Sequence, residues 1–275
     1  MNGNARIKAY LAARSIAQIG LARDENHNYY LDGKGPIVSV TSVLKIVDKS
    51  GPLIGWAKRI TAEAALRHAA ELPQWIEDFG GDGAVGMLTK ATNVIRDKAA
   101  NAGSEIHQLA DAIVKGQEVV VPEELQPYVT ALLHWQQEFE PEYLASEEMV
   151  FSRHGYAGTL DAIVRISGEV WLVDYKTSKG VYEETALQLA AYGAADFIGR
   201  PGDPLRYSIP PVDQYGVVHI RPEGAELVPY DVTGAFEAFL AAKRLGEWRS
   251  SRQIVGQPIG SALLKFQAPA KEAVA

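Results

Sequence analysis

The sequence of 275 residues contains no cysteine. This absence excludes disulfide bonds, zinc sites with thiolate ligands, iron–sulfur clusters and cysteine nucleophiles. The sequence also lacks an apolar run of the length that a membrane helix needs, and its first residues contain no hydrophobic leader segment. We therefore expect a cytoplasmic protein with no membrane partner.

Basic residues are in the minority: 27 Lys and Arg stand against 34 Asp and Glu, which gives a formal net charge of −7. This balance argues against a protein that coats nucleic acid through a bulk positive field. It is compatible with a nuclease, because carboxylates that hold a divalent cation add negative charge. Candidates for a local basic patch along a nucleic-acid backbone are Lys58, Arg59, Arg67, Lys90, Arg96, Lys98, Lys179 and Arg221. Trp56 and Tyr182 are candidates for stacking on unpaired bases, although a core position is the favoured interpretation for Trp56.

The hydrophobic pattern divides the chain at about residues 50 and 250. Residues 1–50 combine a predicted helix over 7–22 with a hairpin whose turn is Asp32-Gly33-Lys34-Gly35. Residues 251–275 have weak periodicity, which favours a flexible tail. The part between them, 51–250, is predicted to be a core domain with a helical insertion.

The spacing of apolar residues changes within this core domain. Helical spacing predicts helices over 54–72, 88–116 and 123–139, with a glycine-rich loop at 80–83. Alternation and turn residues then predict strands over 147–153, 158–166, 169–176, 214–221 and 225–230, and helical spacing returns over 183–198 and 232–247. This order predicts an α/β protein, with a mixed central β-sheet flanked by helices and a helical N-terminal portion.

Charged residues interrupt two of the most apolar predicted strands. The two-residue period of a strand puts Asp174 and Lys176 on one face, following Leu172. The turn at Ser167-Gly168 folds the preceding strand back, so that Asp161 can lie beside Asp174. Carboxylates that converge on one spot repel each other, and a divalent cation is the natural compensation. For Asp174-Tyr-Lys176 alone, a surface hairpin with a solvated ion pair is the simpler alternative, but the strand context and the paired Asp161 favour the metal site.

The chemistry that this group predicts is phosphodiester hydrolysis. Mg²⁺ or Mn²⁺ on Asp161 and Asp174 would lower the pKa of a bound water and neutralise phosphoryl oxygens. Lys176 would orient that water or neutralise the developing negative charge.

Three segments together resemble a known family. Gly158-Thr-Leu-Asp161, Asp174-Tyr-Lys-Thr177 and Gln188-Leu-Ala-Ala-Tyr192 resemble the PD-(D/E)XK nuclease superfamily, in particular the branch of RecB-like nucleases and phage exonucleases. The resemblance implies a restriction-endonuclease-like fold and a metal held by the two aspartates. It also implies that the backbone carbonyl of Tyr175 faces the metal. Because the chain has no cysteine, it resembles the members without an iron–sulfur cluster.

Further residues follow from the same resemblance. Gln188 and Tyr192 lie four apart, hence on one helix face, and are implied to support the active site or contact DNA. Gly103-Ser-Glu-Ile-His107 resembles the Gly-x-x-x-His segment of the branch, which implies that His107 is a metal ligand. Related nucleases also carry an acidic residue near Glu147 and Glu148, and strand alternation allows only one of these to face the site. We favour Glu148.

A hydroxyl-rich turn precedes one of the predicted helices. Ser39-Val-Thr-Ser42 resembles a turn that some phage exonucleases use near a DNA-end phosphate. Free N–H groups at a helix N-terminus suit a phosphate, but a plain helix N-cap is the simpler interpretation.

The function expected from the sequence is that of an Mg²⁺- or Mn²⁺-dependent DNA exonuclease in recombination, repair or phage DNA processing. One alternative is a structure-specific endonuclease with the same site, and another is a non-catalytic DNA-binding or assembly protein of the same fold. The complete set of Asp161, Asp174 and Lys176 argues against the non-catalytic alternative. The choice of DNA over RNA, polarity, strand preference, oligomeric state and any single-strand-annealing or recombination partner stay open.

Overall fold

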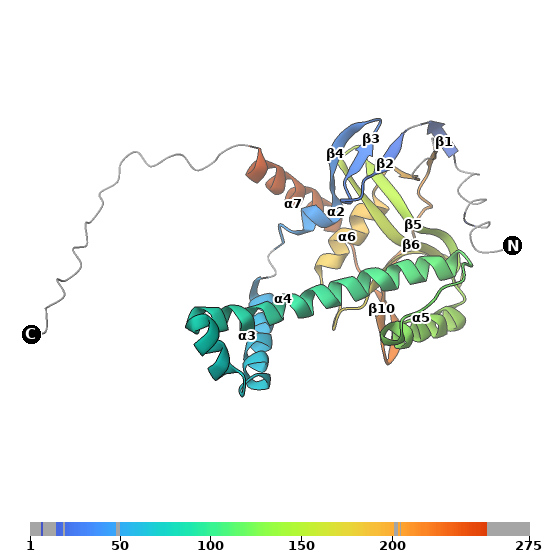
Figure 1. Ribbon diagram of the computed structural model, residues 1–275. Helices are drawn as coiled ribbons and strands as arrows, with labels where there is room; N and C mark the ends of the chain where they lie inside the picture. The colour runs from blue at the N-terminus through green and yellow to red at the C-terminus, as the bar shows by residue number, and fades with distance from the viewer. Residues whose placement is uncertain are drawn as a thin grey trace, which may run out of the picture.

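The computed structural model describes residues 7, 15–18, 20–47, 50–200, 203 and 205–251. It is a mixed β-sheet with helices packed against it, as Figure 1 shows. The predicted α/β class with a mixed central sheet, flanking helices and a helical N-terminal portion is confirmed. Apart from residue 251, the predicted flexible tail lies outside the described residues.

The centre of the sheet is a three-stranded antiparallel unit followed by a crossover. It consists of β5 (Glu142–Ser152), β6 (Tyr156–Ile166) and β7 (Glu169–Lys176). Helix α6 (Glu184–Gly193) then leads across the sheet, and β10 (Gln214–Arg221) returns parallel to β7, with β11 (Gly224–Pro229) antiparallel beside it. All five strands predicted for this region are present, with ends that differ by a few residues.

Shorter strands extend the sheet on the β5 side. They are β8 (Phe197–Gly199), β9 (Leu205–Tyr207) and β1 (Ser15–Gln18), which pair in that order outward from β5. The predicted helix over 183–198 therefore ends early, because its last residues pair as β8.

The N-terminal hairpin joins the sheet through β6. It comprises β2 (Leu21–Arg23), β3 (Tyr29–Leu31) and β4 (Lys34–Ser39), and β4 runs parallel to the start of β6. The expected helix over 7–22 is wrong where β1 and β2 form, because ladder hydrogen bonds at a sheet edge override a weak local period. Ile7 is helical and buried, and most of the remaining residues of that range lie outside the described part.

Helices cover both faces of the central strands. On one face α2 (Val40–Leu44), α6 and α7 (Ala235–Ser250) pack together. On the other lie α5 (Gln126–Phe139), preceded by the short 3-10 helix η1 (Glu123–Leu125), and the C-terminal part of α4 (Leu72–Val114). Each face of the sheet therefore has its own hydrophobic core. Leu172 packs in the core of the first face and Val173 in the core of the second. Burial on both faces explains why β7 is a nearly continuous apolar run.

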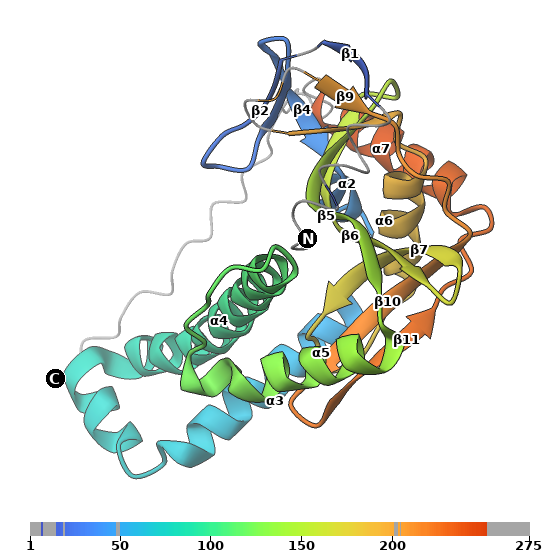
Figure 2. The same ribbon diagram turned by 90° about the vertical axis from the view of Figure 1, so that its right-hand side faces the viewer.

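Helix α3 (Ser50–Arg67) and the first part of α4 form a helical hairpin that projects from the body of the molecule (Figures 1 and 2). We call residues 50–98 the α3–α4 arm. The loop predicted at 80–83 is wrong, because the chain stays helical there except for a kink at Gly80, whose φ is 73°. Although α4 has 43 residues, neither it nor any other described helix is long and apolar enough to span a membrane.

Candidate metal-dependent active site

The acidic residues lie where β6 and β7 run side by side. Ala162 is opposite Val173, and continuing this antiparallel register places Asp161 opposite Asp174, as the sequence predicted. Both carboxylates line a cleft of about 1180 Å³. Helix α4 forms one wall of this cleft, and the hairpin β2–β4 with the start of α2 forms another. Figure 2 shows how these elements are arranged around the central strands.

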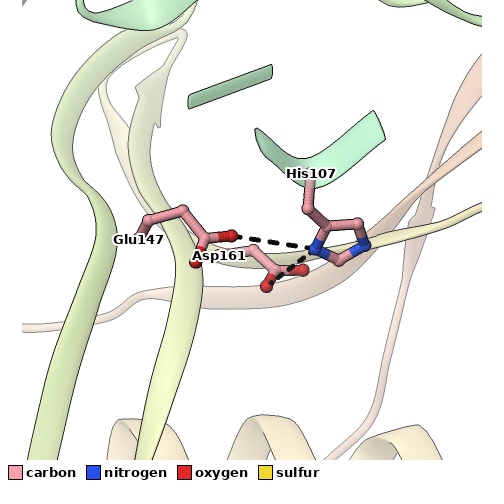
Figure 3. A group of neighbouring side chains, drawn as sticks. All are labelled: His107, Glu147 and Asp161. Atoms are coloured by element: carbon pink, nitrogen blue, oxygen red, sulfur yellow. Dashed lines mark ion pairs between the residues drawn. The ribbon is translucent and has the colours of Figure 1, made fainter. Parts of the chain in front are cut away.

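Three side chains from three elements converge on this cleft (Figure 3). The His107 Nδ1 atom on α4 lies 3.3 Å from Asp161 Oδ1 on β6 and 3.8 Å from Glu147 Oε1 on β5. One ligand atom from each of the three residues lies within 4.8 Å of the others. One imidazole and two carboxylates are donors that divalent first-row metals accept. His107 and Asp161, which the resemblance gives as metal ligands, thus lie side by side.

The preference for Glu148 over Glu147 is wrong. The structure turns Glu147 toward His107, whereas Glu148 is buried and its carboxylate pairs with Arg200, with contacts of 2.6 to 3.0 Å. Glu147 has a left-handed backbone, with φ of 49°, which strand alternation does not anticipate. Such a conformation is unfavourable for a residue with a side chain and persists where surrounding contacts hold it. The contacts next to it are the Arg200 pair and a 2.7 Å hydrogen bond from Ser146 to Asp111.

Asp174 belongs to a second set of contacts beside the His107 cluster. The Gln188 amide donates to Asp174 Oδ1 at 2.7 Å, and the Lys176 ammonium forms an ion pair with Asp174 Oδ2. The Gln188 Oε1 atom lies 3.4 Å from Lys176 Nζ, and the Gln188 Nε2 atom lies 3.5 Å from the Tyr192 hydroxyl. Gln188 and Tyr192 therefore lie at the site, on one face of α6, as the sequence predicted. Gln188 contacts both members of the Asp174–Lys176 pair, and Tyr192 contacts Gln188.

The backbone and the side chain of Tyr175 contact different residues of the site. Its N–H donates to Asp161 Oδ2 at 2.6 Å, which fixes that carboxylate. Its hydroxyl lies 3.2 Å from the hydroxyl of Tyr143, and its ring meets the His107 ring edge-on with centroids 6.0 Å apart. The prediction that the Tyr175 carbonyl faces a metal stays a prediction.

The buried charges of the site shift each other's pKa values. Burial disfavours the imidazolium of His107, but the carboxylates of Asp161 and Glu147 outweigh this effect and raise the His107 pKa to about 11. Burial raises the pKa of Asp174 to about 6, although Lys176 acts in the opposite direction. Burial likewise raises the pKa of Glu147. Without a metal, a proton on His107 thus supplies the positive charge that the carboxylates require.

Two glycines let the elements approach closely. A Cβ atom on Gly103 would lie 3.3 Å from Thr177 Oγ1, so this glycine brings α4 close to the end of β7. A Cβ atom on Gly158 would lie 2.6 Å from Tyr192 Cε1, a separation that nonbonded atoms do not tolerate. Both glycines belong to the motifs recognised in the sequence, and their role in the structure is steric.

The cleft walls carry basic and polar groups that differ from those expected. None of the eight basic residues considered in the sequence lines the cleft, and six of them lie on the α3–α4 arm. The basic residues of the walls are Arg23, Lys45 and Lys115. Sequence reasoning missed these three, although Lys115 follows Asp111 by one helical turn on the His107 stripe. Ser39 is a plain N-cap, accepting from the Ser42 N–H at 3.0 Å, while the side chains of this turn also line the cleft.

Comparisons with known proteins add little. No protein-family model and no curated protein matches the chain. A solved structure described as "Crystal structure of SSO0001" is similar at 16% sequence identity, over 57% of this chain and 72% of that one, with a TM-score of 0.26. A likeness at this level supports neither a family nor a function, so the site is interpreted from its own geometry.

Proposed function

We propose that this protein is a metal-dependent DNA nuclease of the PD-(D/E)XK type, which hydrolyses phosphodiester bonds. The observation that carries the proposal is the convergence of His107, Glu147 and Asp161 next to the Asp174–Lys176 pair in one cleft. The motif resemblance gives the same residues, with Glu148 favoured over Glu147, and the geometry favours Glu147 instead.

The donor set suits a divalent cation, for which we propose Mn²⁺ or Mg²⁺. Three donors lie within reach of one ion, and a third carboxylate, Asp174, lies on the neighbouring strand β7. The carboxylates of Asp161 and Glu147 raise the pKa of His107, so a cation that binds here displaces the imidazolium proton. His107, Glu147 and Asp161 would hold the ion, with the Tyr175 N–H keeping Asp161 oriented. When bound, a divalent cation neutralises phosphoryl oxygens and lowers the pKa of a coordinated water.

The other residues act on the substrate and on each other. Lys176 presents a half-buried ammonium to the cleft, where it would stabilise the negative charge that develops on the phosphoryl group. Asp174 holds this ammonium in place, and Gln188 holds Asp174 through its amide. The Tyr192 hydroxyl contacts Gln188 from the same helix face and would help to hold its amide in place. Each group is therefore oriented before substrate binds, which is the arrangement that electrostatic stabilisation of a transition state needs.

The test is cleavage of a set of end-labelled nucleic acids with Mg²⁺, Mn²⁺ or EDTA. The set contains linear duplex, closed circular duplex, single-stranded DNA and a single-stranded RNA of the same sequence. We expect metal-dependent loss of linear DNA and intact circles, as for the exonuclease that the motif resemblance implies. We also expect Lys176→Ala to lower the rate roughly 100-fold or more.

Lys34→Ala is the matched control, because Lys34 is exposed and does not line the cleft. Its rate should equal that of the wild type. Cutting of circles would make the enzyme an endonuclease with the same site. A folded wild-type protein that cleaves no substrate with either metal would overturn the proposal.

A further inference from the structure

The α3–α4 arm carries an unusual share of exposed apolar surface. Eight of the thirteen large hydrophobic side chains that are exposed in the described part of the chain lie on it. They are Leu53, Ile54, Leu66, Ile76, Phe79, Val85, Met87 and Val94. Isolated exposed hydrophobic residues are ordinary, but a concentration of this kind marks an interaction surface.

One side of α3 is an apolar groove. It is lined by Ile54, Ala57, Lys58, Thr61, Ala62 and Ala65. These positions recur at three- and four-residue spacing, so they form one stripe along the helix. Most of the side chains in the stripe are small, which leaves a shallow, open groove of about 510 Å³. A groove of this shape accepts large side chains that project from another helix.

Large side chains of that kind lie on the same arm, beyond the turn into α4. Ile76 is 53% exposed and Phe79 is 60% exposed. They are flanked by acidic residues: the stretch 71–82 contains Glu71, Glu77, Asp78 and Asp82 and no Lys or Arg. Glu77 and Asp82 form no ion pair within the described residues.

Helix α3 has the opposite charge. It contains Lys58, Arg59 and Arg67 and a single acidic residue, Glu63, which pairs with Arg59. Lys58 stands at the rim of the apolar groove. The arm therefore has an apolar groove flanked by basic residues on α3. On α4 it has two exposed apolar side chains, Ile76 and Phe79, flanked by acidic residues, which we call the acidic projection.

We propose that the arm is a dimerisation surface, on which the groove of one copy receives Ile76 and Phe79 of a second copy. The basic α3 of each copy then faces the acidic stretch 71–82 of its partner. A two-fold axis makes both contacts at once, because each copy supplies one groove and one projection. This inference is independent of the proposed nuclease activity.

The available area suits this partner. The eight exposed side chains of the whole arm offer on the order of 800 Å², so the arm has room for the area that each partner contributes to a standard interface. A second copy also matches the charges of both helices, whereas a nucleic acid would match only the basic helix. The acidic projection next to a phosphate backbone would be repelled.

The experiment is sedimentation velocity of the full chain over a range of protein concentrations. We expect a dimer for the wild type. Phe79→Asp places a charge in the groove and should raise the dimer dissociation constant at least about tenfold. Val120→Asp is the control, since Val120 is 95% exposed outside the arm and its substitution should leave the dimer intact. Circular dichroism verifies that each variant is folded.

A charge exchange tests the pairing itself. One variant carries Lys58→Glu and Arg67→Glu, and the other carries Glu77→Lys and Asp82→Lys. Each variant alone should be monomeric, because like charges meet in its dimer, and an equimolar mixture should form a heterodimer in which all pairs are opposite. A wild type that stays monomeric at high concentration, or a mixture that does not associate, overturns the proposal. Loss of DNA binding by the α3 variant alone would instead assign the arm to nucleic acid.

Discussion

Glu147 and Glu148 are adjacent carboxylates with different environments, so the same substitution in each separates metal binding from folding. Saturating Mn²⁺ at 100 times its dissociation constant stabilises a folded protein by about 2.7 kcal/mol. Glu147→Gln removes a charged donor of the His107 cluster and should reduce the Mn²⁺-induced rise in melting temperature by at least half. Thermal unfolding with Mn²⁺ and with EDTA measures this difference.

Glu148→Gln is the matched variant for comparison with Glu147→Gln. It leaves the largely buried Arg200 guanidinium without its carboxylate and should lower the free energy of unfolding in EDTA by roughly 2–4 kcal/mol. The Mn²⁺-induced stabilisation should persist in this variant. An unchanged Mn²⁺ shift in Glu147→Gln would remove Glu147 from the metal site.

Most of the site residues could be predicted from the sequence, but the choice of Glu147 over Glu148 could not. Asp161, Asp174 and Lys176 follow from strand periodicity and a turn, both of which are local properties. The orientation of Glu147 depends on a left-handed backbone that contacts with distant residues hold in place. No period in the sequence encodes such a conformation. The same applies to Lys115, whose place in the cleft depends on how α4 packs on the sheet.

Close packing between β6 and α6 gives a prediction at the level of elements. In Gly158→Ala the new methyl group would lie 2.6 Å from the Tyr192 ring and 3.3 Å from Val40. Tyr192 is only 2% exposed, so it cannot move without disturbing the core. We expect a loss of roughly 1–3 kcal/mol in the free energy of unfolding. Urea denaturation measures this loss.

Nuclease activity should fall in the same variant, because a displaced Tyr192 no longer supports Gln188. Gly246→Ala on α7 is the matched control. Its added Cβ would meet Ile46 at an ordinary 3.5 Å, and alanine favours the helix by up to about 1 kcal/mol. Full stability of Gly158→Ala would mean that Tyr192 packs less tightly on β6 than the structure indicates.

Elements with strong local patterns were predictable, and those defined by tertiary pairing were not. The run β5, β6, β7, α6, β10, β11, α7 follows from alternation, helical spacing and turn residues. The range 7–22 has apolar residues that suit a helix, yet β1 forms because β9 offers it a partner. Gly80 to Gly83 resemble a loop in composition, but in the structure one kinked residue is enough for the helix to continue.

The whole molecule brings together parts of the chain that are distant in sequence. The site is formed by α4, by the strands β5 to β7 and by α6, while the cleft wall opposite α4 comes from the N-terminal hairpin. The net charge of −7 means that binding to nucleic acid depends on where the basic residues lie. The basic residues of the arm and the basic residues of the cleft form separate groups. Each group therefore predicts a different path for a bound nucleic-acid strand.

The salt dependence of DNA binding distinguishes these two paths. Four basic residues line the cleft, namely Arg23, Lys45, Lys115 and Lys176. If a single strand follows the cleft, the slope of log K against log salt should be no steeper than about −3, because each neutralised phosphate contributes about −0.7. Lys45→Gln should make the slope shallower by about 0.7, since Lys45 is exposed and lines the cleft. Lys90→Gln on the arm should leave it unchanged. Fluorescence anisotropy of a labelled oligonucleotide in EDTA gives both slopes without cleavage, and the reverse pattern would place the strand along the arm.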